Sequence, residues 1–296
     1  MTNVGILHTG AASPSAEEFL AELRNSLADF NFTEGRNVHF ELRSAGGTAA
    51  KLPQQAAELV ALKVDVIVAH LTPPAVAAKQ ATTEIPIVIA GAGDPLGTGL
   101  VASLAHPGGN VTGYSTASAE VAGKSVELIH DMFPSVRRIA VLSNETDPFS
   151  ISYIAQIQQN ADRAGLEALP IRLQPTAPQE PAFQTMHDKE AGAVIVQGSI
   201  MRPQTIALAT QFHLPSLGSI ASWPRQGGLM SYSADPSEMY HSVAEYIDKI
   251  VKGRKPADLP VALPTKFDLV VNTKTARAIG ATIPESFLAR ASEVIE

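Results

Sequence analysis

Short runs of apolar residues, many of them Val and Ile, alternate with longer amphipathic stretches along the whole chain. Apolar runs separated by segments of helix length are typical of βα units, which build parallel sheets covered by helices. The candidate strands are residues 4–8, 38–43, 64–70, 86–90, 111–114, 138–143, 166–173, 193–197, 215–218, 228–233 and 267–271. The pattern therefore predicts an α/β fold with parallel sheets.

The amphipathic segments repeat near 3.6 residues, the period of a helix that packs on a sheet through one face. Two lobes of similar size fit the length, because one series of strands ends before Ser115 and a second starts at Arg138, after a long helix predicted over 120–133. The sequence contains no internal repeat, so such a duplication would be one of architecture only. The clearest apolar stripes are Phe19, Leu20, Leu23, Leu27 and Phe30 in 15–31, and Tyr240, Val243, Ile247 and Ile250 after Asp235.

A polar residue followed by Pro stands after several of the strand runs. A Ser, Thr or Asp before a Pro is the usual N-cap and first residue of a helix. Helices that begin at the carboxyl ends of parallel strands favour anionic ligands such as a carboxylate, although the same caps also serve simply to start helices. These pairs are Ser13-Pro14, Thr72-Pro73, Asp94-Pro95, Asp147-Pro148 and Asp235-Pro236, with Arg202-Pro203 in an equivalent place without a capping side chain.

Composition narrows the choice of partners and chemistry. The chain has 296 residues, 45% apolar and 17% charged, with 29 acidic against 22 basic residues and a net charge of −7, which disfavours nucleic acid and anionic membranes as partners. It has no cysteine, and its eight histidines are scattered singly, so that neither a disulfide nor a metal site is expected. No uncharged apolar stretch reaches the ~18 residues that span a bilayer, and no signal peptide precedes Val4. The chain therefore fits a cytoplasmic protein or a mature form whose export signal has been removed.

Sequence signatures of catalysis are not found. There is no Gly-x-Ser-x-Gly elbow, no Walker loop and no dinucleotide fingerprint. We therefore expect no catalytic residues, no cofactor and no enzymatic activity, and a protein that binds without chemistry. An enzyme that uses Asp94 and His70 as an acid/base pair is the alternative that these residues leave open.

A series of ordered motifs over the whole chain resembles the ABC-transporter substrate-binding proteins of the tryptophan/tyrosine type. The resemblance rests on FTEGRNV at 32–38, LVALKVDVIV at 59–68, AAKQAT at 77–82, IPIV at 85–88, GDP at 93–95, GLVASLA at 99–105, PGGNVTG at 107–113, GGLMSY at 227–232, LPTKF at 263–267, NTKTA at 272–276, IP at 283–284 and EVIE at 293–296.

The resemblance implies a type I periplasmic-binding-protein fold, in which two doubly wound parallel-sheet α/β lobes are joined by three crossovers and close on a small solute in the cleft between them. The crossovers would lie near Ser115, near Ser233 and after Lys255, which gives a first lobe of 1–115 plus 233–256 and a second of 116–232 plus 257–296. It also implies a protein in the periplasm or anchored at the cell surface, which delivers its solute to the permease subunits of an ABC importer. We expect the protein to be a monomer.

The chain departs from the family pattern at three places. Asn144-Glu145-Thr146-Asp147-Pro148 replaces an Asn-Pro pair, Gln197-Gly198-Ser199 replaces an Asp-Pro step, and His70-Leu71 stands where a Gly-rich stretch is common. The second change removes a carboxylate that would pair with an amine. Specificity for one amino acid is therefore not carried over from the relatives.

The predicted ligand is a small carboxylate-bearing organic molecule, either an amino acid or an aromatic acid. Hydroxyl caps at Ser13 and Thr72 would bind the carboxylate, and Asp147 or Asp235 would accept from an amine or hydroxyl. Tyr114 and Tyr232 would stack on the solute or belong to the core. The full set of predicted ligand contacts is Thr9, Ser13, His70, Thr72, Asp94, Tyr114, Asn144, Asp147, Gln197, Ser199, Ser219, Tyr232 and Asp235.

A cytoplasmic ligand-sensing module of the repressor-effector type shares the two-lobed fold and is the alternative function. It requires a DNA-binding element, for which the chain leaves no room before Val4.

Overall fold

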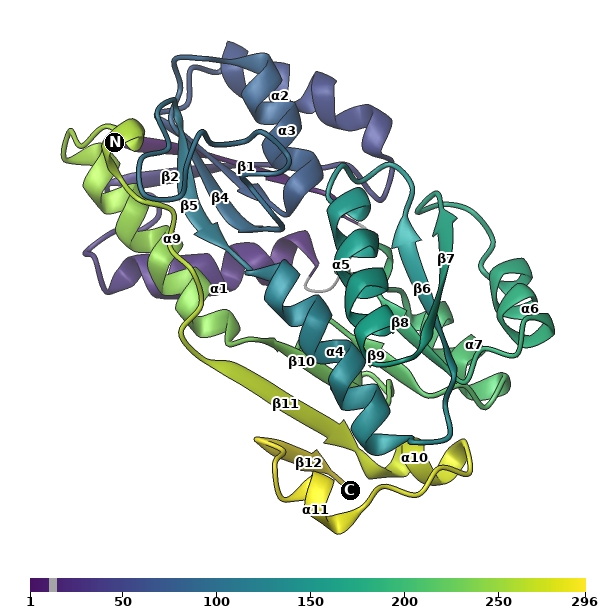
Figure 1. The fold of residues 1–296 in the computed structure, drawn as a ribbon. Helices are drawn as coiled ribbons and strands as arrows, with labels where there is room; N and C mark the ends of the chain where they lie inside the picture. The colour runs from purple at the N-terminus through teal and green to yellow at the C-terminus, as the bar shows by residue number, and fades with distance from the viewer. Residues whose placement is uncertain (11–14) are drawn as a thin grey trace. The chain divides into compact units, whose positions relative to one another are not determined.

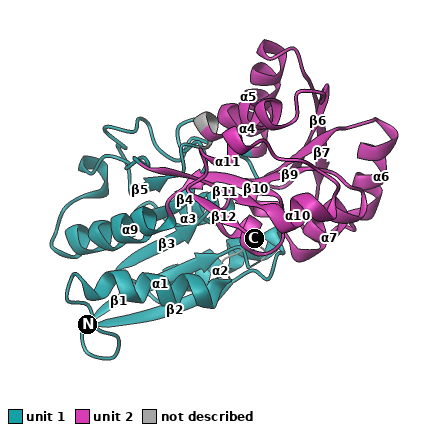
Figure 2. Ribbon diagram, turned by 90° about the horizontal axis from the view of Figure 1, so that it is seen from below, with its two compact units in different colours: residues 1–117, 147–149, 236–265 teal, residues 118–146, 150–235, 266–296 magenta. Residues whose placement is uncertain are grey.

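The computed structural model describes residues 1–10 and 15–296, with no account of the side chains of residues 118–120. The described residues divide into two compact units (Figure 2). Unit 1 comprises Met1–Ala117, Asp147–Phe149 and Pro236–Thr265, and unit 2 comprises Ser118–Thr146, Ser150–Asp235 and Lys266–Glu296.

Unit 1 is built on a parallel sheet, as the alternating pattern predicts. Its described residues form five strands in the order β2-β1-β3-β4-β5, and each neighbouring pair is parallel. The strands are β1 (Thr2–His8), β2 (Val38–Ser44), β3 (Val66–His70), β4 (Ile87–Ala92) and β5 (Val111–Ser115).

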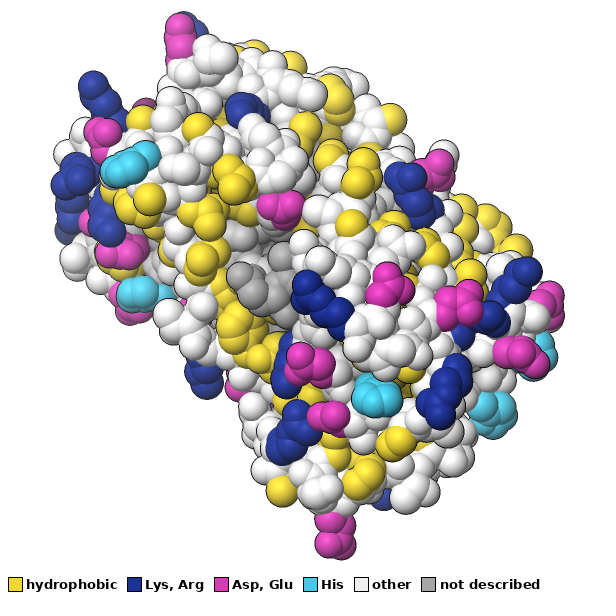
Figure 3. Space-filling view, viewed as in Figure 1, with side chains coloured by type: hydrophobic (Ala, Val, Ile, Leu, Met, Phe, Trp, Pro, Cys, Tyr) yellow, Lys and Arg dark blue, Asp and Glu magenta, His cyan; other side chains and the backbone are white. Residues whose placement is uncertain are grey.

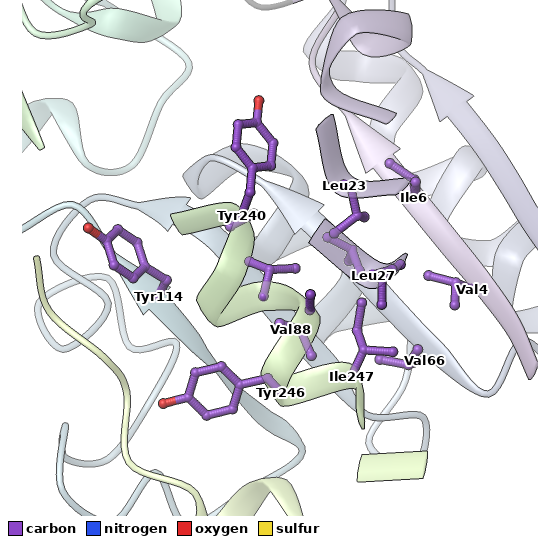
Figure 4. Packing of buried hydrophobic residues seen from close by; sticks show 14 of the residues in the cluster. Val4, Ile6, Leu23, Leu27, Val66, Val88, Tyr114, Tyr240, Tyr246 and Ile247 are labelled. Atoms are coloured by element: carbon purple, nitrogen blue, oxygen red, sulfur yellow. The ribbon is translucent and has the colours of Figure 1, made fainter. Parts of the chain in front are cut away.

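Helices cover both faces of this sheet because alternate strand residues point to opposite sides. Val4 and Ile6 pack with α1 and α9, whereas Leu7 packs with α2 and α3. Figure 4 shows the first of these cores, in which Leu23 and Leu27 of α1 face Ile247 of α9. The helices are α1 (Ala16–Ala28), η1 (Ala49–Lys51), α2 (Leu52–Ala61), α3 (Thr72–Ala81), α9 (Pro236–Val251) and η3 (Pro256–Asp258).

Unit 2 contains a second sheet, with seven strands among the described residues in the order β12-β11-β10-β9-β8-β6-β7 (Figure 1). Strands β6 to β10 run parallel. The strands are β6 (Arg138–Asn144), β7 (Glu167–Leu173), β8 (Ala193–Val196), β9 (Ser216–Gly218), β10 (Met230–Ala234), β11 (Phe267–Asn272) and β12 (Glu293–Ile295).

Strand β11 is an exception to the parallel arrangement, because it runs antiparallel to β10. The chain leaves unit 2 after Asp235 and re-enters it at Lys266 beside the same strand end, where Phe267 pairs with Ala234 and the Asp235 N–H donates to the Lys266 carbonyl. A strand that starts beside the end of its neighbour has to run back along it. Strand β12 was not predicted, because three half-exposed residues carry too little of a periodic signal.

The core of unit 2 joins β6 and β8 to helices α6 and α7 and to the chain's single tryptophan, Trp223. Helices α4 and α5 pack on each other, α5 also contacts β6 and β7, and α4 contacts β10. The helices of this unit are α4 (Ser118–Met132), α5 (Ser150–Arg163), α6 (Glu180–Asp188), η2 (Gly198–Ile200), α7 (Pro203–Gln211), α8 (Ser222–Arg225), α10 (Thr273–Ala278) and α11 (Glu285–Leu288).

The two sheets repeat one topology. The order β2-β1-β3-β4-β5 of unit 1 recurs in unit 2 as β7-β6-β8-β9-β10. Both are doubly wound sheets, in which the chain moves outward in one direction and then returns to build the other side.

The chain passes between the units after Ala117, after Asp235 and after Thr265, and residues 147–149 are grouped with unit 1. The third passage lies later than Lys255 because the segment after η3 is bonded to the sheet of unit 1. The Val261 N–H donates to the Leu104 carbonyl, and Ala262 exchanges backbone hydrogen bonds with Gly113 and Ser115. Residues 257–265 therefore belong to unit 1.

The surface mixes charges of both signs. On the described residues of the face drawn in Figure 3, Lys and Arg side chains are interspersed with Asp and Glu. Among the residues that the structure describes, no helix combines the length and the apolar character that crossing a membrane requires.

Candidate functional site

The doubly wound topology points to one place in each sheet. In unit 1 the strand order reverses between β1 and β3, and in unit 2 it reverses between β6 and β8. Ligands of open α/β sheets bind outside the carboxyl ends of the strands at such switch points, because the connections there leave in opposite directions. The residues that end these four strands are therefore the candidate site, taken unit by unit.

At the switch point of unit 1, two histidines end the two strands. His8 ends β1 and His70 ends β3, and their rings are stacked with centroids 4.5 Å apart and planes 10° from parallel. Phe19 of α1 lies with its ring centroid 4.6 Å from that of His70, and Tyr240 of α9 lies 5.5 Å beyond Phe19. Both histidines are buried.

Burial keeps these two imidazoles uncharged. It lowers the pKa of His8 to about 4, and burial together with the neighbouring His8 holds the pKa of His70 well below its usual value. At pH 7 both rings are neutral, because the charged form would lose its hydration without gaining a partner. His70 stays a predicted ligand contact that ends β3 at the switch point, and His8 lies beside it without having been predicted from the sequence.

Thr72 lies at this switch point, but the prediction that it is the N-cap of α3 is wrong. Helix α3 begins at Thr72 itself, and its N-cap is Leu71, a non-glycine residue with φ of +71°. The Thr72 hydroxyl accepts from the Gly93 N–H at 3.0 Å and donates to the Gly93 carbonyl at 3.3 Å. Its proton is therefore used inside the protein, where it ties the start of α3 to the end of β4.

Asp94 follows β4 and begins a turn, so the helix predicted after it is wrong. Its φ is +42°, and its carboxylate accepts from the Gly97 N–H at 2.8 Å. Glycines at 97 and 99 favour such a turn over a helix.

Two more predicted residues lie near the strand ends of unit 1. Thr9 follows β1 directly. Ser13 lies outside the described residues. Helix α1 is capped by Ser15, whose hydroxyl accepts from the Glu18 N–H in a capping box, so that the start of α1 is two residues later than the Ser13-Pro14 pair predicts.

At the switch point of unit 2, four buried polar side chains form one network. The Gln197 Oε1 accepts from the Asn144 N–H and from the Ser150 hydroxyl, both at 2.8 Å. The Asn144 amide reaches the Ser199 hydroxyl at 3.4 Å, and its oxygen accepts from the N–H and hydroxyl of Thr146 at 2.9 Å. The network brings together three of the predicted ligand contacts, Asn144, Gln197 and Ser199, and adds Ser150.

Asp147 is the one carboxylate among the buried polar side chains of the described residues. Its Oδ1 accepts from the Phe149 N–H at 3.0 Å, which caps the turn that leads into α5 at Ser150. Asp235 stands directly before α9, as predicted for an N-cap, and its carboxylate pairs with Lys266 at 3.3 Å.

The remaining predicted contacts are Ser219 and two tyrosines. Ser219 follows β9 and is half-buried. Tyr114 belongs to the core of unit 1, as Figure 4 shows, and is 2% exposed. The ring of Tyr232 stacks on Phe267 of the antiparallel neighbour strand at 5.5 Å. Tyr114 thus packs in the core of unit 1, and one face of the Tyr232 ring is covered by Phe267.

Within the described part of the chain, no three His, Asp or Glu side chains come together in a way that would hold a metal ion. The buried groups at both switch points are hydroxyls, amides and neutral imidazoles, with Asp147 as the one acid. Side chains of this kind bind a polar solute by hydrogen bonds.

Two doubly wound sheets of the same order, visited alternately by the chain, are the architecture of type I periplasmic binding proteins, a class that binds small solutes. The model of the family described as ABC transporter substrate binding protein matches residues 8–295. The chain belongs to this family, whose members are the extracytoplasmic or surface-anchored solute-binding components of ABC transporters.

Known relatives agree with this assignment. The tyrosine-binding protein of Clostridioides difficile (strain R20291) is 24% identical over 280 residues, which cover 94% of this chain and 80% of that protein. The structure of an ABC domain from Streptococcus pneumonia in complex with L-Trp is 29% identical, with a TM-score of 0.91 and 99% of each chain covered. A conserved domain protein of Vibrio cholerae matches with the same identity, TM-score and coverage.

Proposed function

We propose that the solute of this protein is a small carboxylate-bearing organic molecule, an amino acid or an aromatic acid, bound for delivery to the permease of an ABC importer. The observation that carries the proposal is the match over the whole chain to the L-Trp complex, which shares 29% of its residues. The tyrosine-binding relative supports the same class of solute.

The candidate site is suited to this solute class. No Lys or Arg is buried among the described residues, and the strands end instead in hydroxyls, amides and imidazoles. A carboxylate accepts hydrogen bonds from such neutral donors. Because the acceptor is charged, these hydrogen bonds are shorter and stronger than those between two neutral groups. We propose that the carboxyl edges of both sheets supply the contacts, with Thr9, His70 and Asn144 among them.

We further propose that the protein holds its solute without changing it. Asp94 accepts a backbone N–H in its own turn, and His70 stacks on a second neutral imidazole. Neither side chain is paired with the other as a general acid and base need to be. We also propose that the protein acts outside the cytoplasmic membrane and as a monomer. Light scattering on the purified protein tests the monomeric state.

Ligand identity decides the proposal. Native mass spectrometry of freshly purified protein would detect a solute that is carried through purification. Protein that has been unfolded, dialysed and refolded is then screened by thermal shift against L-tryptophan, L-tyrosine, L-leucine, benzoate and 4-hydroxybenzoate. A ligand present at about a thousand times its Kd adds about 4 kcal/mol to the free energy of unfolding and raises the melting temperature by several degrees.

The screen has three outcomes. A stabilising acid that is recovered chemically unchanged supports the proposal. An acid that is converted during incubation would make the protein an enzyme. If none of the acids stabilises the refolded protein, the proposed solute class is wrong, although the family assignment stands.

A further inference from the structure

Three polar side-chain atoms at the switch point of unit 1 are buried without a hydrogen-bond partner among the described residues. They are Nε2 of His8, Oγ1 of Thr9 and Nδ1 of His70. Native proteins leave few such atoms unpaired, because each one costs about 1–3 kcal/mol. Three of them at the ends of two adjacent strands indicate a place where another molecule supplies the missing partners.

The hydrogen-bond geometry of His8 sets the chemistry of that partner. The Gly10 N–H donates to His8 Nδ1 at 2.9 Å, so Nδ1 carries a lone pair. In a neutral imidazole the proton then lies on Nε2, which makes the unpartnered atom a donor. The Thr9 hydroxyl also has a proton to donate. The partner is therefore a hydrogen-bond acceptor.

The backbone of α3 adds little to this donor set. A helix N-terminus usually binds an anion through its free N–H groups. Here the second and third residues of α3 are Pro73 and Pro74, which have no N–H, and the Ala75 N–H already donates to the Leu71 carbonyl. Donors for an acceptor at this switch point have to come from side chains.

We propose that His8 and Thr9 form the subsite that holds the carboxylate of the solute, with the His8 Nε2–H and the Thr9 hydroxyl as its donors. The inference rests on the proposed function and assigns the solute's acidic group to unit 1. His70 supports the subsite by stacking on His8, and Phe19 packs against both rings.

The test uses the acid of highest affinity in the five-compound screen and measures its Kd by calorimetry on refolded protein. His8→Phe keeps a ring in the stack but removes the donor, and Thr9→Val removes the hydroxyl at constant shape. His8→Gln restores an N–H donor. His39→Gln, at an exposed position on β2 of the same unit, is the matched control.

We expect His8→Phe and Thr9→Val each to raise the Kd by about tenfold or more, because each removes a hydrogen bond to a charged group. His8→Gln recovers most of the loss, and His39→Gln binds as the unchanged protein does. The Kd is the same at pH 5.5 and pH 7.5, because the donor is a neutral imidazole. If His8→Phe does not fold, Thr9→Val and His8→Gln still decide the proposal.

Two results would overturn the inference. If folded His8→Phe and Thr9→Val bind the acid as tightly as the unchanged protein does, the carboxylate lies elsewhere, and the proposed function survives. If the Kd rises steeply from pH 5.5 to pH 7.5, the subsite uses a charged imidazole instead of a neutral donor. Failure of the unchanged protein to bind any acid in the screen removes the proposed function first and this inference with it.

Discussion

Acid should weaken unit 1 through the stacked histidines, and the size of the effect follows from the pKa of His8. An exposed histidine has a pKa of 6.5, whereas burial lowers that of His8 to about 4. The unfolded chain therefore binds a proton at a pH where the folded protein does not. Stability that is fully present above pH 6.5 is lost as the pH falls toward 4.

One pKa unit corresponds to about 1.36 kcal/mol, so His8 accounts for about 3 kcal/mol over the whole interval. About 2 kcal/mol of this is lost by pH 5, where the unfolded histidine is almost fully protonated and the folded one is mostly neutral. The pKa of His70 is lowered in the same direction, so His70 adds to the loss. Stabilities of protein units are only about 5–15 kcal/mol, so the change is readily measured.

The assay is urea unfolding followed by far-ultraviolet circular dichroism at pH 7, 6 and 5. The unchanged protein is compared with His8→Phe, which cannot titrate at this position, and with the control His39→Gln. Most carboxylates titrate below this interval, so the histidines dominate the difference.

We expect His8→Phe to lose about 2 kcal/mol less than the unchanged protein between pH 7 and pH 5, and His39→Gln to lose as much as the unchanged protein does. Equal losses for His8→Phe and the unchanged protein would refute the reasoning. They would mean that His8 is solvated and protonates in the folded state as readily as in the unfolded chain.

Two further predictions concern packing and the α3 junction. Gly228→Ala should cost about 1–3 kcal/mol and change the fluorescence of Trp223, because its Cβ would lie 2.2 Å from the indole Nε1; Gly109→Ala, whose Cβ would meet nothing within 4 Å, should leave both unchanged. Thr72→Val should cost about 1–3 kcal/mol in urea unfolding, since it leaves the N–H and carbonyl of Gly93 unpaired, and Thr72→Ser should restore most of the loss. A Thr72→Val variant as stable as the unchanged protein would show that water replaces the hydroxyl.

Hydrophobic periodicity was enough to predict the sheets. Every predicted strand lies on a strand of the structure, and the stripe of Phe19, Leu23 and Leu27 faces the core of unit 1 as expected. The signal is strong because both faces of a parallel sheet are buried, which makes its strands nearly continuous apolar runs. The antiparallel direction of β11 was beyond this signal, because it depends on where the chain re-enters unit 2.

Local polar chemistry was less predictable than the strands. The pairs at Thr72 and Asp94 both look like helix caps, yet one residue lies inside its helix and the other begins a turn. The choice depends on hydrogen bonds between segments that are distant in sequence, such as the one from Gly93 to Thr72. His8 was missed for a related reason: a single histidine at a strand end acquires meaning only when topology places His70 beside it.

Both switch points rely mainly on uncharged polar side chains, although the residues that supply them differ. A buried Lys or Arg that faces a carboxylate would be left as an unpaired, poorly hydrated charge whenever the solute leaves, at a cost of several kcal/mol. Neutral imidazoles, hydroxyls and amides lose much less, so the solute-free state of each edge is tolerable. Unit 2 meets much of this smaller cost internally, because Gln197 pairs with Asn144 and Ser150, although the Ser143 hydroxyl on β6 has no partner among the described residues. Unit 1 leaves three atoms unpaired at its switch point, on His8, Thr9 and His70, and this larger set is why we assign the carboxylate to unit 1.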